Sequence, residues 1–288
     1  MGLALGCGVM AAPGQASASS LDLFYERTVM AAADARCGLF SGGVGSALSS
    51  ARAQARGAAM RAGVDRPTLK TVEARAISRA STAPCDSNDM TVAAERVRGA
   101  FEGYSRLIRM DYPGDLSIWR ADRSSSVQAA RWRLDQDVTF GDSRMVFGLA
   151  GRRGANVLLA LAHFPGGAAP YSARLVLRDD DATAGPYLDN RGASLATMPL
   201  ARRLPPPAAQ RTYTAEARST AGLDLLPAGM KAGWAFRFPA EAARALAQLD
   251  PREAVAVDFL FAGDVTRRAY VEVGDFAAGR AFLQVASR

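Results

Sequence analysis

The spacing of apolar residues changes along this chain near Tyr112-Pro113-Gly114. Before that point, apolar residues recur every three to four positions, which is the spacing of helices that bury one face. After that point, as between 130 and 140, apolar residues alternate with polar ones, which is typical of half-buried strands. The predicted fold class is therefore α+β, with an N-terminal helical part followed by a mostly antiparallel β-rich part that carries two C-terminal helices.

The same patterns predict where each element begins and ends. We expect a helical domain at 19–111, a linker at 112–124 and a β-rich α+β domain at 125–288. Helices are expected at 21–36, 44–62, 65–80, 88–110, 239–249 and 275–285, with Ser20, Ser87 and Asp275 as caps. Strands are expected at 130–140, 144–150, 156–164, 171–178, 211–218, 234–238, 254–261 and 267–273.

The first 18 residues resemble a secretory signal peptide, because the apolar run Leu3–Ala12 is followed by the small residues of 16–19. Cleavage after Ala18 would remove Cys7. No positive charge precedes Leu21, so two alternatives stay open: an irregular N-terminus on a cytosolic protein, and acylation at Cys7. The expected location is the periplasm or the medium, and no other segment is apolar enough to predict a membrane span.

Two cysteines, Cys37 and Cys85, remain after this cleavage. In an oxidising compartment they are expected to form a disulfide that stabilises the helical part. Closing a loop of 48 residues is worth about 3–4 kcal/mol. The alternative is two unrelated buried thiols.

The chain is basic, with a net charge of +7, yet this does not predict a nucleic-acid partner. Lys70 and Lys231 are the two lysines among 35 basic residues, so arginine dominates, and the bias indicates a GC-rich coding sequence. The charges are scattered among acidic residues instead of forming a basic run. A mildly cationic surface would still attract anionic lipids or acidic polysaccharides.

Several kinds of catalytic site are excluded by counting. His163 is the one histidine, whereas zinc and most transition metals require three or four suitable ligands. No G-x-S-x-G motif accompanies His163, which is expected to be a buried or strand-end residue with a hydrogen-bond partner. The sequence therefore predicts no metal, no cofactor and no catalytic residue.

Two groups of residues remain as candidate binding sites. Around the predicted linker, Tyr112 and Trp119 accompany polar groups that a sugar site uses: Asp111, Asp115, Arg120 and Asp122. The alternative is that Trp119 packs the sheet against the helices and that Asp122 pairs with Arg120 or Arg123. Arginine pairs in predicted loops or strand starts are candidate anion sites: Arg152-Arg153, Arg202-Arg203 and Arg267-Arg268.

Two stretches carry a resemblance to known proteins. The segment from Leu23-Phe24-Tyr25-Glu26-Arg27-Thr28 to Cys37, with Tyr112–Asp115, resembles uncharacterised exported proteins of GC-rich Gram-negative bacteria. The C-terminal order of helix and two strands, followed by Val273–Gly279, is similar to the end of the invasion-associated locus B family of small periplasmic β-rich proteins. This resemblance implies an envelope-associated role without catalysis.

The expected function is that of a non-catalytic periplasmic binding or interaction protein. Its partner would be an envelope protein or an anionic envelope polymer, and its oligomeric state stays open. The alternative is a periplasmic glycan hydrolase that uses the carboxylates near the predicted linker. A third possibility is that the helical part docks a partner protein, for which an exposed apolar stripe on the first two helices would be the sign.

Overall fold

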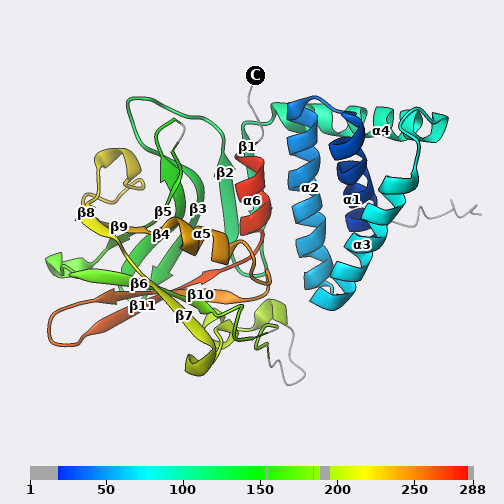
Figure 1. The fold of residues 1–288 in the computed structure, drawn as a ribbon. Helices are drawn as coiled ribbons and strands as arrows, with labels where there is room; N and C mark the ends of the chain where they lie inside the picture. Colours follow the sequence, from blue (N-terminus) through cyan, green and yellow to red (C-terminus); the bar gives the residue numbers. More distant parts are fainter. Residues whose placement is uncertain (1–18, 154, 184, 189–194, 285–288) are drawn as a thin grey trace, which may run out of the picture.

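The structure is a computed structural model that describes residues 19–153, 155–183, 185–188 and 195–284. The predicted signal peptide, with Cys7, lies outside the described residues. Figure 1 shows the helical part and the β-rich part side by side, with the C-terminal helix between them. The predicted α+β class, with helices first and antiparallel sheets after them, is confirmed.

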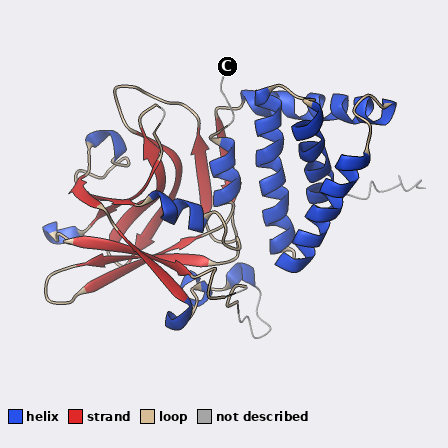
Figure 2. Cartoon of the chain, viewed as in Figure 1, coloured by secondary structure: helices blue, strands red, loops and turns tan. Residues whose placement is uncertain are grey.

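Figure 2 shows the N-terminal helices grouped on one side of the molecule and the strands on the other. The helices are α1 (Ser20–Cys37), α2 (Gly42–Arg61), α3 (Arg66–Thr82), α4 (Asn88–Arg106), α5 (Ala240–Leu246) and α6 (Phe276–Phe282). The strands are β1 (Arg109–Pro113), β2 (Ile118–Asp122), β3 (Arg131–Phe140), β4 (Ser143–Gly151), β5 (Val157–His163), β6 (Ser172–Arg178), β7 (Gln210–Thr214), β8 (Ala217–Thr220), β9 (Trp234–Phe238), β10 (Ala254–Leu260) and β11 (Thr266–Glu272).

Polar side chains cap the N-termini of three of the four N-terminal helices, and polar caps are what the sequence predicted at helix starts. Ser19 caps α1, one residue before the predicted cap Ser20, and accepts a hydrogen bond from a first-turn N–H group at 3.2 Å. Asp65 caps α3 and Ser87 caps α4 in the same way, at 2.9 Å and 3.3 Å. Each cap satisfies an N–H group that has no partner within its helix.

Residues 112–124, predicted as a linker, belong largely to a β-hairpin. Strand β1 pairs antiparallel with β2, and β2 pairs with β3, so the hairpin is the edge of the larger sheet. Helix α4 consequently ends at Arg106 rather than at Met110, since Leu107 is already extended and Arg109 begins β1. Both strands have five residues, and short strands leave little alternation for a pattern to detect.

Helix α2 lies at the centre of the helical part, where it contacts α1, α4 and α6. Its buried alanines recur every four residues: Ala47, Ala51, Ala55 and Ala59. Because these side chains end at Cβ, neighbouring helices approach closely along this face. On the side of α2 that faces α6, the hydroxyl of Ser50 donates a hydrogen bond to the carbonyl of Ala278, at 3.1 Å.

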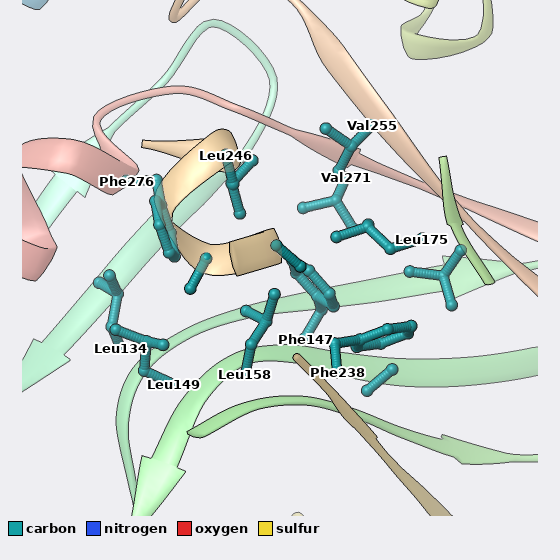
Figure 3. Packing of buried hydrophobic residues seen from close by; sticks show 14 of the residues in the cluster. Leu134, Phe147, Leu149, Leu158, Leu175, Phe238, Leu246, Val255, Val271 and Phe276 are labelled. Atoms are coloured by element: carbon teal, nitrogen blue, oxygen red, sulfur yellow. The ribbon is translucent and has the colours of Figure 1, made fainter. Parts of the chain in front are cut away.

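The β-rich part consists of two antiparallel sheets around one apolar core. The larger sheet has the order β1-β2-β3-β4-β5-β9-β8, and the smaller has the order β11-β10-β6-β7. Figure 3 shows Phe147 and Phe238 of the larger sheet with Leu175 and Val271 of the smaller sheet in this core. Leu246 on α5 packs into the same core, so this helix is part of the β-rich unit.

The predicted strand 211–218 is in fact two strands in different sheets. Strand β7 pairs with β6, whereas β8 pairs with β9. The change falls at Ala215, whose N–H group bonds the carbonyl of Ala173, and Glu216, whose N–H group bonds the carbonyl of Arg237. Two residues separate the strands, so only the identity of the paired strand reveals the division.

Ion pairs join the helical part to the β-rich part. Arg61 of α2 holds the buried carboxylate of Asp275 through two contacts, at 2.6 Å and 3.0 Å. Arg66 of α3 contacts Asp180 at 2.6 Å, and Asp180 in turn contacts the buried Arg178 at 2.6 Å. Asp275 occupies the predicted N-cap position of α6, but its side chain makes this bidentate pair and no cap hydrogen bond.

The predicted disulfide between Cys37 and Cys85 is confirmed, with the two Cα atoms 5.7 Å apart. It ties the C-terminal end of α1 to the loop that precedes α4. Across the described ranges, no helix is both long enough and apolar enough to cross a membrane.

Candidate functional site

A cleft of about 910 Å³ lies between the helical part and the larger sheet. Its walls come from the start of α2, the second half of α4, the chain after β2 and the turn between β4 and β5. The lining residues are 41–44, Arg98, Glu102, 105–108, 123–125 and Arg153. Four segments that are distant in the sequence therefore meet at this cleft.

Arginine dominates the charge of the cleft. Four arginines line it, Arg98, Arg106, Arg123 and Arg153, against one acidic residue, Glu102, which leaves an excess of three positive charges. Glu102 is already engaged, because it forms an i, i+4 ion pair with Arg106 on the surface of α4. The cleft is therefore a region of positive potential that is open to solvent.

Two buried guanidinium groups strengthen this potential. Arg123 is 5% exposed; it donates hydrogen bonds to the carbonyls of Ser105 (3.0 Å) and Tyr104 (3.1 Å) and lies 4.0 Å from the centre of the Phe282 ring. Arg133 donates to the carbonyl of Arg123 at 3.1 Å. Burial lowers the pKa of both arginines, because it removes water from the charged form.

The N-terminus of α2 adds a further positive element. Ser41 occupies the cap position, but its side chain makes no capping hydrogen bond, and the first turn carries no acidic residue. The first N–H groups of a helix have no partner within it, and the helix dipole places partial positive charge there. Gly42 and Gly43 bring this end of the helix to the wall of the cleft.

The arrangement offers many hydrogen-bond donors and few acceptors. Guanidinium groups make paired hydrogen bonds to carboxylate, phosphate or sulfate groups, and these are stronger than bonds between neutral groups. Serine hydroxyls from three of the walls accompany them: Ser41, Ser105, Ser124 and Ser125. The chemistry therefore suits an anionic ligand.

The structure separates the arginines that the sequence singled out. Arg153 lines the cleft, whereas Arg152, exposed in the same turn, is not among the lining residues. Arg203 is fully buried and contacts Asp115 at 2.9 Å, and Arg268 holds the buried carboxylate of Asp258 at 2.5 Å. Arg203 and Arg268 are thus structural residues, because their guanidinium groups serve carboxylates of the protein itself.

Tyr112 and Trp119 do not provide the predicted sugar platform, because both rings are fully buried. The hydroxyl of Tyr112 lies 2.8 Å from that of Tyr104, and burial raises the pKa of Tyr112. The indole N–H of Trp119 donates to the carbonyls of Glu272 and Val273 at 3.1 Å and 3.0 Å. This position matches the alternative prediction, that Trp119 packs the sheet against the helices, because its ring lies 5.0 Å from that of Phe276 on α6.

The junction carboxylates are spread over the hairpin. Asp115 lies in the turn before β2, whereas Asp122 ends β2 and accepts a hydrogen bond from Arg109 at 2.7 Å. The pKa of Asp122 is lowered, because hydrogen bonds from Ser124 and Arg109 outweigh the effect of its partial burial. A strand of five residues spans about 13 Å, which exceeds the separation of about 5–9.5 Å used by glycosidases. This separation does not favour a hydrolase that pairs Asp115 with Asp122.

A row of charged side chains crosses the hairpin at Asp111, Arg120 and Asp135. Arg120 lies 3.9 Å from Asp135, whose side chain is 22% exposed.

Asp135 faces Gly148 on β4, where any side chain would clash. A Cβ at Gly148 would lie 1.9 Å from the carbonyl oxygen of Leu134, and the φ angle of Gly148 is +153°. Burial raises the pKa of Asp135 to about 6; Arg120 opposes this shift, and Asp137, Asp111 and Asp122 add to it.

This raised pKa predicts that Asp135 makes stability depend on pH. The folded chain favours the protonated carboxyl of Asp135. The stability that this preference provides is fully present below about pH 4 and is lost as the pH rises through about 6. Asp135→Asn should therefore gain stability relative to the wild type between pH 4 and pH 7, by up to about 3 kcal/mol. Urea unfolding at a series of pH values measures this difference.

Asp137→Asn is the matched control, two residues along the same strand. Arg144 hydrogen-bonds Asp137 at 2.9 Å and lowers the pKa of its carboxyl. This variant should be less stable than the wild type above about pH 4, and the difference should disappear as the pH falls through the lowered pKa of Asp137. Equal pH profiles for the two variants would show that Asp135 carries no such effect.

In the part of the chain that the structure describes, no cluster of three or more histidine, cysteine or acidic side chains could hold a metal ion. His163 ends β5, and its Nδ1 lies 3.0 Å from the carbonyl oxygen of Ala232. This position confirms the prediction of a strand-end histidine with a hydrogen-bond partner.

Three arginines of the cleft were missed in the sequence: Arg98, Arg106 and Arg123. A partial signal exists on α4, where Arg98, Glu102 and Arg106 follow at i, i+4 and i+8 and so share one face. Nothing local reveals that Arg153 joins them, because it follows Arg106 by 47 residues.

No protein-family model, curated protein or solved structure matches this chain.

Proposed function

We propose that this protein binds an anionic polymer of the cell envelope in the arginine-lined cleft and does not convert it chemically. The observation that carries the proposal is the excess of three positive charges around a solvent-open cleft of about 910 Å³. Arginines from three walls of the cleft and the start of a helix supply hydrogen-bond donors for such a ligand.

The spacing of the arginines supports a polymer rather than a single small anion. Arg98 and Arg106 are eight residues apart on α4, which corresponds to about 12 Å along the helix axis. Arg153 reaches the cleft from a different wall. Anionic groups that repeat along an extended chain could contact several of these positions at once, and linked contacts raise the overall affinity.

The disulfide supports the location in this proposal. Disulfides persist in oxidising compartments such as the periplasm and the exterior of the cell, and are rare in the cytosol. The bond between Cys37 and Cys85 therefore favours a protein that folds after export. The envelope polymers of bacteria carry phosphate and carboxylate groups and are accessible from that side.

Binding to polygalacturonate and to long-chain polyphosphate, with neutral dextran as reference, tests the function. Arg98→Glu combined with Arg153→Glu should weaken binding of the charged polymers at least tenfold at low salt, because it turns the cleft's excess charge from +3 to −1. Isothermal titration calorimetry at two salt concentrations measures the affinities, which should fall as salt rises.

The control is Lys70→Glu combined with Arg202→Glu, two exposed positions outside the cleft that change the net charge equally. Binding should survive in this variant. Equal losses in both double variants would mean that only net charge matters, and no binding of either polymer by the wild type would refute the function itself.

A further inference from the structure

We propose that a groove between α1 and α4 is a docking site for an acidic amphipathic helix of a partner protein. The groove has a volume of about 510 Å³ and is called here the α1–α4 groove. Tyr25, Val29 and Met30 of α1 form one wall, and Val97 and Phe101 of α4 form the other. It is separate from the arginine-lined cleft and does not depend on the function proposed there.

The apolar face of α4 lacks a full partner within the chain. The spacing of its apolar residues gives a clear stripe, yet Met90 and Ala94 are the residues of α4 that are buried. Val97 and Phe101 are half-buried, and Ala100 is exposed. Apolar surface gathered in a groove of this size is typical of interaction sites.

The path of α4 explains why this face stays open. The disulfide holds the start of α4 near the end of α1, and from there α4 runs across the end of the other helices (Figure 1). Its main contacts in the helical part are with α2, so α1 and α4 diverge and leave the groove between them. The shape is that of a gap between two helices, which suits a further helix presenting residues at i, i+3, i+4 and i+7.

The charges around the groove select the partner. Three arginines line it, Arg27, Arg79 and Arg96, against Glu26, which leaves an excess of two positive charges. Burial lowers the pKa of Arg27, whose guanidinium also donates to the carbonyl of Ala51 at 2.7 Å. A second copy of this chain would bring the same arginines face to face, and like charges across an interface are unfavourable. Glutamates or aspartates that flank an apolar stripe would complement this rim.

The two sites use different faces of α4. The groove is lined by Arg96, Val97 and Phe101 of this helix, whereas the arginine-lined cleft is lined by Arg98, Glu102 and Arg106. A polymer in the cleft and a partner helix in the groove can therefore be tested separately on the same protein.

The experiment uses two synthetic amphipathic peptides of about 18 residues, five helical turns, with leucines at i, i+3, i+4 and i+7. One carries glutamate at the remaining positions, and the other carries lysine. Fluorescence anisotropy should show that the wild type binds the glutamate peptide at least tenfold more tightly than the lysine peptide.

Variants on α4 locate the binding. Val97→Asp should weaken binding of the glutamate peptide at least tenfold, whereas Val92→Asp, an exposed valine of the same helix outside the groove, should leave it unchanged. Arg96→Glu lies on the exposed surface and should shift the preference toward the lysine peptide without affecting folding. This variant decides the question if Val97→Asp fails to fold.

Four results would overturn the proposal. These are equal affinity for the two peptides, equal losses in Val97→Asp and Val92→Asp, an unchanged preference in Arg96→Glu, and dimers of the wild type in sedimentation that Val97→Asp dissociates. Binding to phosphatidylglycerol vesicles that is lost in Val97→Asp, without binding of the glutamate peptide, would assign the groove to a membrane surface instead.

Discussion

Replacing Glu272 with alanine is expected to lower the free energy of unfolding by about 3–5 kcal/mol, because it removes one partner of a buried charged cluster. Glu272 is fully buried at the end of β11, and its carboxylate lies 3.5 Å from the guanidinium of Arg203. The same carboxylate accepts hydrogen bonds from the backbone N–H groups of Asp115 (2.7 Å), Leu116 (2.9 Å) and Ser117 (2.8 Å).

These contacts make Glu272 the acceptor for three of the four N–H groups in the turn between β1 and β2. Alanine would leave three part-buried N–H groups without this acceptor, and an unsatisfied N–H group that is fully buried costs about 1–3 kcal/mol. The turn is fitted closely to the carboxylate, since a Cβ at Gly114 would lie 2.7 Å from it. Glu272→Gln should cost less, because the amide keeps one oxygen acceptor while losing the charge.

Guanidinium unfolding followed by tryptophan fluorescence measures the effect, and Trp119 contacts the carbonyl of Glu272 directly. The control is Glu216→Ala, since Glu216 is half-exposed and lies 3.6 Å from Arg237. Removing such a surface pair should cost about 0–1 kcal/mol. Similar losses for Glu272→Ala and Glu216→Ala would contradict the role given to the buried cluster.

The second large effect is expected from removing the disulfide. Cys37→Ser combined with Cys85→Ser should lower the free energy of unfolding by about 3–4 kcal/mol, because the unfolded chain regains the freedom of a 48-residue loop. The helical part has few other interactions that could compensate for this loss of stability. Its buried apolar clusters are small and rich in alanine and short side chains, in contrast to the continuous core of the β-rich part.

Thermal unfolding followed by far-ultraviolet circular dichroism measures this loss. A reductant should destabilise the wild type to the level of the double serine variant and should not destabilise that variant further. If the reductant leaves the wild type unchanged, or if mass spectrometry of protein from its native host finds both thiols free, the disulfide and the location inferred from it are wrong.

Local sequence patterns predicted the helices and most strands to within a few residues. Helix α3 begins after Asp65 and α4 after Ser87, as expected, because a cap is a contact between residues three positions apart. Strand β3 at Arg131–Phe140 follows the alternation seen at 130–140. In each case the information lies within one turn or one strand.

The predictions failed where the partner lies far along the chain. Asp275 has the sequence position of a helix cap, but Arg61 is 214 residues away and takes its carboxylate. The sequence left open whether Trp119 is exposed or buried. The reason is that the carbonyls of Glu272 and Val273, which accept hydrogen bonds from its indole N–H, lie far along the chain. The hairpin of β1 and β2 was missed because its pairing with β3 stabilises strands that are too short to identify alone.

The amino-acid sequence by itself determined the order of helices and strands, the cysteine pair and the basic character of the chain, since these depend on neighbouring residues or on composition. Only the tertiary structure decided that Arg98, Arg123 and Arg153 share one cleft, while Arg203 is buried with Asp115. The physical reason is that hydrophobic burial is not directional. It specifies which side chains leave water, whereas pairing of strands and charges across long separations selects which of them meet.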